Sequence, residues 1–193
     1  MKRIALLVLI FTLGASSAEA ALRETPDGIP IQHPSDKLPL FVTPSPEVAA
    51  WMPEIRQITD LYNKLIGSNV FIVLGPRHIP HSENPPLVIT ASHEMGTQLN
   101  VDARTGLIVS SEITLSMSES YSHTDKLAIL LHAFGMILGL AELETADKPY
   151  DIMAREFIRA GGRVLPHDIE TLRRLYGKTS TRLMRSDATI LWL

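Results

Sequence analysis

The feature that most constrains this chain is an apolar run, Leu127 to Ala141, in which His132 is the one polar side chain. A membrane-spanning helix needs about 20 such residues, whereas a shorter run is more typical of a helix buried in a protein core. Gly135 and Gly139 lie within the run, where they suit close packing and a helix end. The run therefore predicts a buried helix that ends near Leu138, and the rest of the chain must build a core around it.

The N-terminus has the three parts of a secretory signal peptide. Lys2 and Arg3 are positively charged, residues 4–13 are apolar, and Ala18-Glu19-Ala20 is a small-x-small cleavage site. We therefore predict a signal peptide over residues 1–20, cleaved after Ala20. The mature protein is expected to be secreted or periplasmic, with no membrane segment after cleavage.

Charge and cysteine content exclude several classes of protein. The formal net charge is −3, and the one basic run, residues 173–185, is typical of a solvated helix face and tail. We therefore expect no nucleic-acid partner, since such partners select clustered basic surfaces. The chain has no cysteine, which excludes disulfides and a cysteine nucleophile.

The mature chain alternates helical and strand patterns in one domain. Apolar residues recur at three- and four-residue steps over residues 47–66, which is the spacing of an amphipathic helix. Short segments rich in β-branched and apolar residues predict strands at 69–74, 87–91, 97–101 and 107–115. Two further helices are expected at 122–138 and 166–176.

The two ends of the mature chain carry weaker patterns. Residues 21–46 are Pro-rich and lack a sustained period, so we predict an extended lead-in or a pro-segment. The domain is then expected over residues 47–178, followed by a tail at 179–193. The apolar end of that tail, Ala188 to Leu193, is expected to pack on the core.

His132 begins a spacing that is typical of zinc metalloproteases. In the pattern H-E-x-x-H-x-x-G-x-x-H, two histidines face one ion from a helix, and a glycine turns the chain so that a third joins them. The chain has His132 and Gly139 at matching positions. It has Ala133 in place of the glutamate, Met136 in place of the second histidine and Glu142 in place of the third. On these positions the chain resembles the metzincin metallopeptidases.

Further segments extend the resemblance to the matrixin branch of that family, over about residues 51–177. A turn and a following segment resemble the family's substrate-binding edge strand: residues 101–108, then Ser111, Glu112, Ile113, Thr114 and Leu115. Asp151-Ile152-Met153 falls where the family has its Met-turn, and residues 165–177 resemble its closing helix. The resemblance implies an α+β metzincin-like catalytic-domain fold. Its parts are a mixed twisted sheet, an active-site helix, a Met-turn at Met153 and a C-terminal helix.

The substituted positions argue against hydrolysis. Ala133 cannot take a proton from water, and general acid–base catalysis contributes roughly 10²–10⁴-fold to a rate. Met136 offers a soft thioether that suits Cu(I) better than Zn²⁺, whereas His132 and Glu142 are acceptable zinc ligands. We therefore expect no catalytic residue and no cofactor, and we take His132 and Glu142 as candidate metal ligands.

Each of these side chains also has a structural interpretation. Met136 can fill the core space that an imidazole would occupy, and His132 can be a hydrogen-bonded core histidine. Glu142 can face solvent beyond the helix end. Histidines elsewhere offer no clear replacement ligand, because His78 and His81 flank a proline and His93 has no partner at the required spacing.

Two functions follow from the sequence. The first is a secreted or periplasmic matrixin-like pseudoprotease that binds an extended peptide or a protein partner along residues 107–115. The alternative is an active zinc metalloendopeptidase with an atypical site, built from His132, Glu142 and a ligand from elsewhere. A third possibility, a purely structural envelope protein, would have the same sequence pattern as the pseudoprotease.

Overall fold

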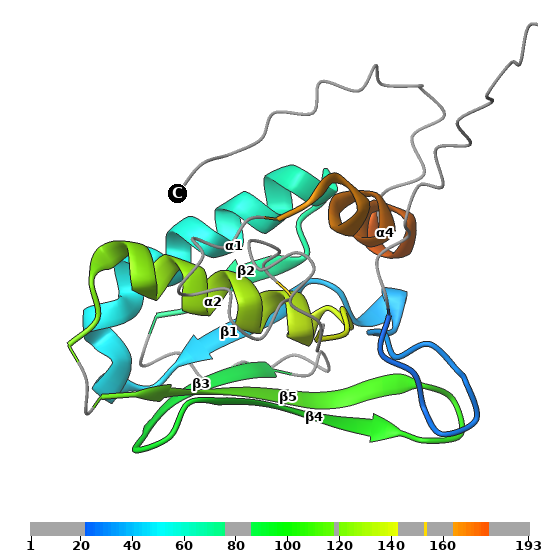
Figure 1. Cartoon of the computed structure of the whole chain (residues 1–193), viewed down its shortest axis with the longest axis horizontal. Helices are drawn as coiled ribbons and strands as arrows, with labels where there is room; N and C mark the ends of the chain where they lie inside the picture. The colour runs from blue at the N-terminus through cyan, green and yellow to red at the C-terminus, as the bar shows by residue number, and fades with distance from the viewer. Residues whose placement is uncertain (1–21, 76–85, 118–119, 143–152, 154–163, 178–193) are drawn as a thin grey trace, which may run out of the picture.

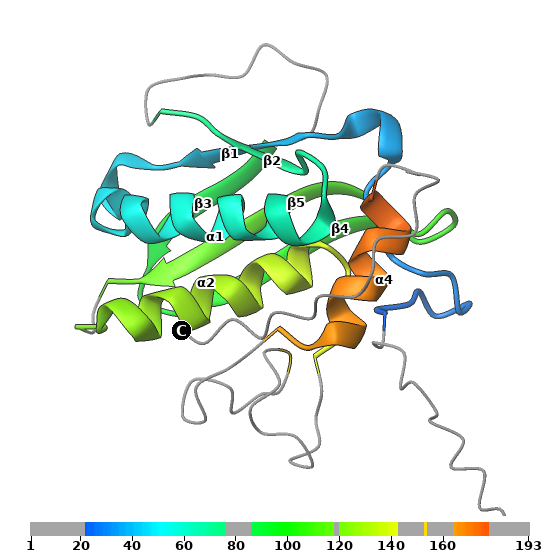
Figure 2. The ribbon, with the colours of Figure 1, turned by 90° about the horizontal axis from the view of Figure 1, so that it is seen from above.

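The computed structural model describes residues 22–75, 86–117, 120–142, 153 and 164–177. A five-stranded mixed sheet carries α1 (Met52–Ile66) and α2 (His123–Ile137) on one face, and α4 (Pro166–Tyr176) lies beside them (Figures 1 and 2). The strands are β1 (Leu40–Pro44), β2 (Phe71–Val73), β3 (Pro86–Ser92), β4 (Gly96–Asp102) and β5 (Leu107–Ser116). Two 3₁₀ turns, η1 (Ser35–Lys37) and η2 (Pro46–Trp51), flank β1. The α+β class is therefore confirmed.

The strand order places β4 at one edge of the sheet. The order is β2-β1-β3-β5-β4, with β4 and β5 antiparallel and the other pairs parallel. Residues 111–114 of β5 pair with β3 on one side and with β4 on the other, and Leu115 pairs with β3. The prediction that these residues form an edge strand is therefore wrong. The turn at residues 102–106 folds β4 and β5 into a hairpin, and β3 takes the inner side of β5.

Strand β1 lies within the stretch predicted as a lead-in. It pairs with β2 on one side and β3 on the other, and Leu40 and Val42 are fully buried. Pro39 and Pro44 bracket the strand, which hid its alternating pattern inside a Pro-rich stretch. The predicted lead-in at residues 21–46 therefore contains β1, which lies between β2 and β3 in the sheet.

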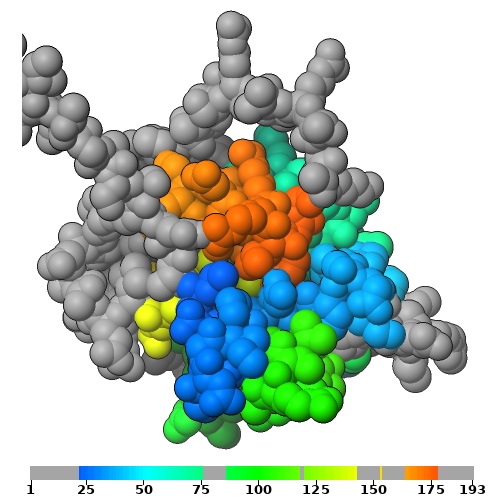
Figure 3. All heavy atoms as spheres, turned by 90° about the vertical axis from the view of Figure 1, so that its right-hand side faces the viewer, coloured from blue at the N-terminus to red at the C-terminus, as the bar shows by residue number. Residues whose placement is uncertain are grey.

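The segment before β1 is also tied to the domain. The amide of Arg23 donates to the carbonyl of Gly139 at 2.8 Å, and the amide of Gln32 donates to the carbonyl of Gly106 at 3.0 Å. Figure 3 shows this segment, in blue, lying against α4 and against the β4–β5 turn. These contacts link the segment to the end of α2 and to the sheet, so it is an integral part of the fold.

Helix α2 has the buried character that its apolar run predicts. Beyond its first turn, His132 and Met136 are the two residues of α2 that are not buried. Its end is a Schellman motif, in which Leu140 donates to the carbonyl of Gly135 at 3.1 Å and Gly139 has a φ of 90°. The predicted left-handed glycine at the helix end is confirmed.

Aromatic side chains join α2 to α1 and the sheet. The Phe134 and Phe71 rings meet edge to face with centroids 5.0 Å apart, and Tyr62 lies 6.4 Å from Phe134. The Tyr62 hydroxyl donates to the carbonyl of Leu131 at 2.7 Å, so its polar atom is satisfied within the core. This cluster fixes α2 over the sheet and thereby fixes the side chains that α2 presents beside β4.

His33 gives the fold a predicted pH dependence. The ring is buried, its Nε2 donates to the carbonyl of Ile137 at 3.0 Å, and burial lowers the pKa of His33 to about 4. An unfolded histidine has a pKa near 6.5. Neutral His33 therefore contributes roughly 3 kcal/mol to the free energy of unfolding above pH 6.5. This contribution is lost as the pH falls toward 4.

Two measurements check this dependence. An NMR titration of the His33 ring should give a midpoint near 4, and denaturant unfolding should show stability falling between pH 6.5 and 4. His93→Gln, at an exposed position, should keep the same slope. A His33 midpoint near 6.5 in the folded protein would contradict the prediction.

Several predictions concern residues outside those described. These are the signal peptide at residues 1–20, the tail at 179–193, two residues of the Met-turn, Asp151 and Ile152, and the pair His78 and His81. Among the described helices, none has the length and apolar content needed to cross a membrane.

Candidate functional site

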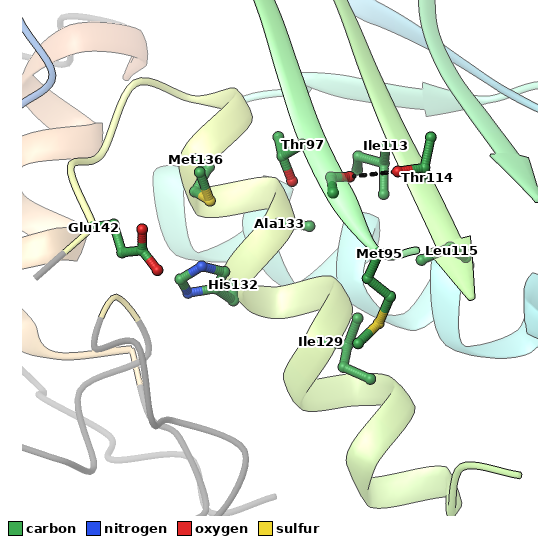
Figure 4. A pocket seen from close by; sticks show the side chains of 11 residues that line it. Met95, Thr97, Ile113, Thr114, Leu115, Ile129, His132, Ala133, Met136 and Glu142 are labelled. Atoms are coloured by element: carbon green, nitrogen blue, oxygen red, sulfur yellow. Dashed lines mark hydrogen bonds between the residues drawn. The ribbon is translucent and has the colours of Figure 1, made fainter. Parts of the chain in front are cut away.

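A pocket of about 340 Å³ lies between α2 and the β4–β5 hairpin (Figure 4). Most of the residues singled out from the sequence line it, together with others that the sequence did not reveal. From β4 and β5 and the turn before β4 come Met95, Gly96, Thr97, Ile113, Thr114 and Leu115; from α2 and beyond come Ile129, His132, Ala133, Met136 and Glu142. The structure therefore brings the substituted motif positions to one cavity beside the sheet edge.

Helix geometry explains how the motif residues reach the pocket. His132 and Met136 are four residues apart and share a helix face, while the methyl group of Ala133 points toward the strands (Figure 4). After α2 ends, the left-handed Gly139 reverses the chain, and Glu142 returns to lie near the His132 ring (Figure 4). The turn glycine thus positions Glu142 as the spacing predicts.

The predicted partner strand contributes only in part. Ile113 and Leu115 point toward α2 and line the pocket. Thr114 also lines it, and its hydroxyl donates to the carbonyl of Gly96 at 3.3 Å. The Glu112 side chain accepts a hydrogen bond from the Thr90 hydroxyl at 2.8 Å instead. Because side chains alternate along a strand, Glu112 lies on the sheet face away from α2. Ser111 is buried and does not line the pocket.

Met153 packs against α2 without lining the pocket. Its side chain is buried, and a methyl group added to Gly135 would lie 2.8 Å from its sulfur. A side chain at position 135 would therefore require Met153 to shift. Met153 therefore supports the helix from the core, and whether it belongs to a Met-turn depends on residues outside those described.

The donor atoms at the site do not fit a hydrolytic zinc centre. Such centres use three nitrogen, oxygen or thiolate ligands and an open position for water. The site offers the His132 imidazole, the exposed Glu142 carboxylate and the Met136 thioether, and Ala133 has no proton acceptor. In the described part of the chain, no three His, Asp or Glu side chains come together. The prediction that the protein has no cofactor remains a prediction.

Four of the lining residues were missed from the sequence: Met95, Gly96, Thr97 and Ile129. Ile129 lies one helical turn before Ala133, so helix periodicity could have identified it. Met95 and Thr97 reach the site because β4 folds back outside β5, and this arrangement has no local signal. Thr97 pairs with Ile113 across the hairpin, which places both side chains on the face toward α2.

Comparison with known proteins identified no relative of this chain. No protein-family model, no curated protein and no solved structure matches the chain. The resemblance to matrixins therefore rests on the motif positions in this sequence alone and stays a prediction.

Proposed function

We propose that this protein is a secreted or periplasmic peptide-binding domain on a matrixin-like frame, which holds an extended segment without hydrolysing it. The observation that carries the proposal is the position of the pocket directly beside β4, a seven-residue strand that, among the described strands, pairs with β5 alone. An edge strand presents unpaired N–H and C=O groups, and a peptide added to it gains main-chain hydrogen bonds. The pocket beside the edge strand then selects among the side chains of the bound peptide.

The side chains at the pocket support binding without catalysis. Hydrolysis needs a water activated by a metal or a base, and the group next to His132 is the methyl of Ala133. Met136 replaces a potential nitrogen ligand by a neutral thioether, which suits Zn²⁺ poorly. The groups that remain favour burial of a ligand side chain over activation of water.

Metal content and proteolysis test this proposal against an active zinc metalloendopeptidase. Residues 21–193, dialysed against zinc and then against buffer, should retain no zinc by mass spectrometry and should not cleave casein. About one zinc per chain, with cleavage that a chelator or His132→Ala abolishes, would replace the proposal by the enzyme. His93→Ala, at an exposed histidine outside the pocket, is the matched control and should behave as the parent chain.

A further inference from the structure

The outer edge of β4 lacks the features that usually keep strands of two molecules from pairing. Exposed edges are commonly protected by charged side chains, by proline or by a bulge that bends the edge strand. Residues 96–101 of β4 carry no charge and include no proline. The irregularity of the hairpin falls on β5, where Val109 has no partner on β4. Among the described strands β4 pairs with β5 alone, and Figure 1 shows it along the border of the sheet.

The side chains of β4 suit pairing with a second copy of the same strand. Gln98 and Asn100 are exposed on one face, and Leu99 lies between them on the opposite face, where it packs against the core. In an antiparallel pair centred on Leu99, the two Leu99 side chains meet and each Gln98 lies opposite Asn100 of the other copy. The Asn100 amide nitrogen donates to the Ser110 hydroxyl at 2.7 Å, which leaves its side-chain oxygen to accept from Gln98. Matched pairs of this kind stabilise a sheet.

The charges that flank β4 favour the register centred on Leu99. Glu94 lies two residues before the strand and Arg104 two residues after it, and both side chains are exposed. In this register Glu94 of each copy comes to Arg104 of the other, so symmetry forms two pairs of opposite charge. A register centred on Gln98 would instead bring Glu94 to Asp102, which has the same charge.

We propose that two copies of this protein pair through β4, antiparallel and with a two-fold axis at Leu99, so that their five-stranded sheets join into one. The same strand serves in both copies, which is the usual geometry of a symmetric dimer. A single strand pair makes a small interface, so we expect a Kd on the order of 100 μM. The dimer goes beyond the proposed function, because a second copy on β4 excludes a peptide from the same edge.

Sedimentation equilibrium of residues 21–193 measures the association. The average mass should rise from one chain toward two between about 10 μM and 1 mM. Glu94→Arg brings two positive charges together at each end of the pair and should weaken the dimer about threefold or more at low salt. Glu94→Arg combined with Arg104→Glu exchanges the charges and should restore it. Asp60→Arg, at an exposed position on α1, is the matched control and should leave the dimer unchanged.

Single cysteines locate the two-fold axis, because the chain has no cysteine of its own. In the proposed register residue 99 faces its own copy, whereas residues 98 and 100 face each other. Under mild oxidation, Leu99→Cys should therefore form a disulfide-linked dimer faster than Gln98→Cys or Asn100→Cys. Glu94 and Arg104 are exposed, so the charge variants test the register even where Leu99→Cys fails to fold.

The outcomes separate the dimer from the proposed function. A mass of one chain up to about 1 mM would overturn the dimer, and retention of peptides by that monomer would keep the proposed function. A dimer that Glu94→Arg does not weaken, or that links fastest through Gln98→Cys or Asn100→Cys, would also overturn the inference. A dimer with the expected variant effects that retains no peptide would support the inference and overturn the proposed function.

Discussion

A chain that begins at residue 47 is expected to lose its cooperative fold. The truncation removes β1, which lies between β2 and β3 and buries Leu40 and Val42 completely. Burial of one such side chain contributes about 1.5–3 kcal/mol, and two ladders of hydrogen bonds are lost as well. The total is comparable to the 5–15 kcal/mol by which a typical domain is stable.

Thermal unfolding followed by circular dichroism measures this effect. Residues 47–193 should show no sharp transition, whereas residues 22–193 should unfold in one step. A folded 47–193 chain with the same transition temperature as the longer one would restore the interpretation of residues 21–46 as a removable lead-in.

Gly139→Ala is expected to destabilise the protein by about 2–5 kcal/mol. Gly139 has a φ of 90°, and a left-handed conformation costs an L-residue roughly 1–2 kcal/mol. A methyl group there would also overlap the carbonyl oxygen of Ile31, which belongs to the N-terminal segment. Displacing that backbone adds about 1–3 kcal/mol, which is the usual cost of overpacking.

Gly67→Ala is the matched control for this substitution. Gly67 ends α1 with a φ of 80°, and nothing lies within 4 Å of the added methyl. It should therefore cost only about 1–2 kcal/mol, the price of the conformation alone. Chemical denaturation of both variants gives the comparison, and equal losses at the two glycines would show that the N-terminal segment does not hold Gly139 as described.

Local patterns in the sequence predicted most of the elements. Residues 166–176 form α4 with the expected bounds, because a proline begins the helix and a glycine follows its apolar face. The apolar run at 127–141 predicted that α2 is buried, and Gly139 predicted where the helix ends. These features depend on residues within one or two helical turns, so the sequence carries them directly.

Features that depend on distant parts of the chain were not predictable in the same way. The position of β1 and the order of β4 and β5 depend on which strands pair, and strand pairing has no local code. The same limit applies to the site. His132, Ala133 and Glu142 were expected together from their spacing, whereas Met95 joins them only through the fold of the hairpin.

The most direct test of the central claim is to ask what the protein retains from a mixture of peptides. Residues 21–193 are incubated with a randomised peptide library, bound peptides are separated with the protein by size exclusion, and both fractions are read by mass spectrometry. We predict that a subset of peptides is retained with both ends intact, and that Ala133→Leu changes that subset. Retention of no peptide, or the appearance of cleaved peptides that a chelator prevents, would contradict the account.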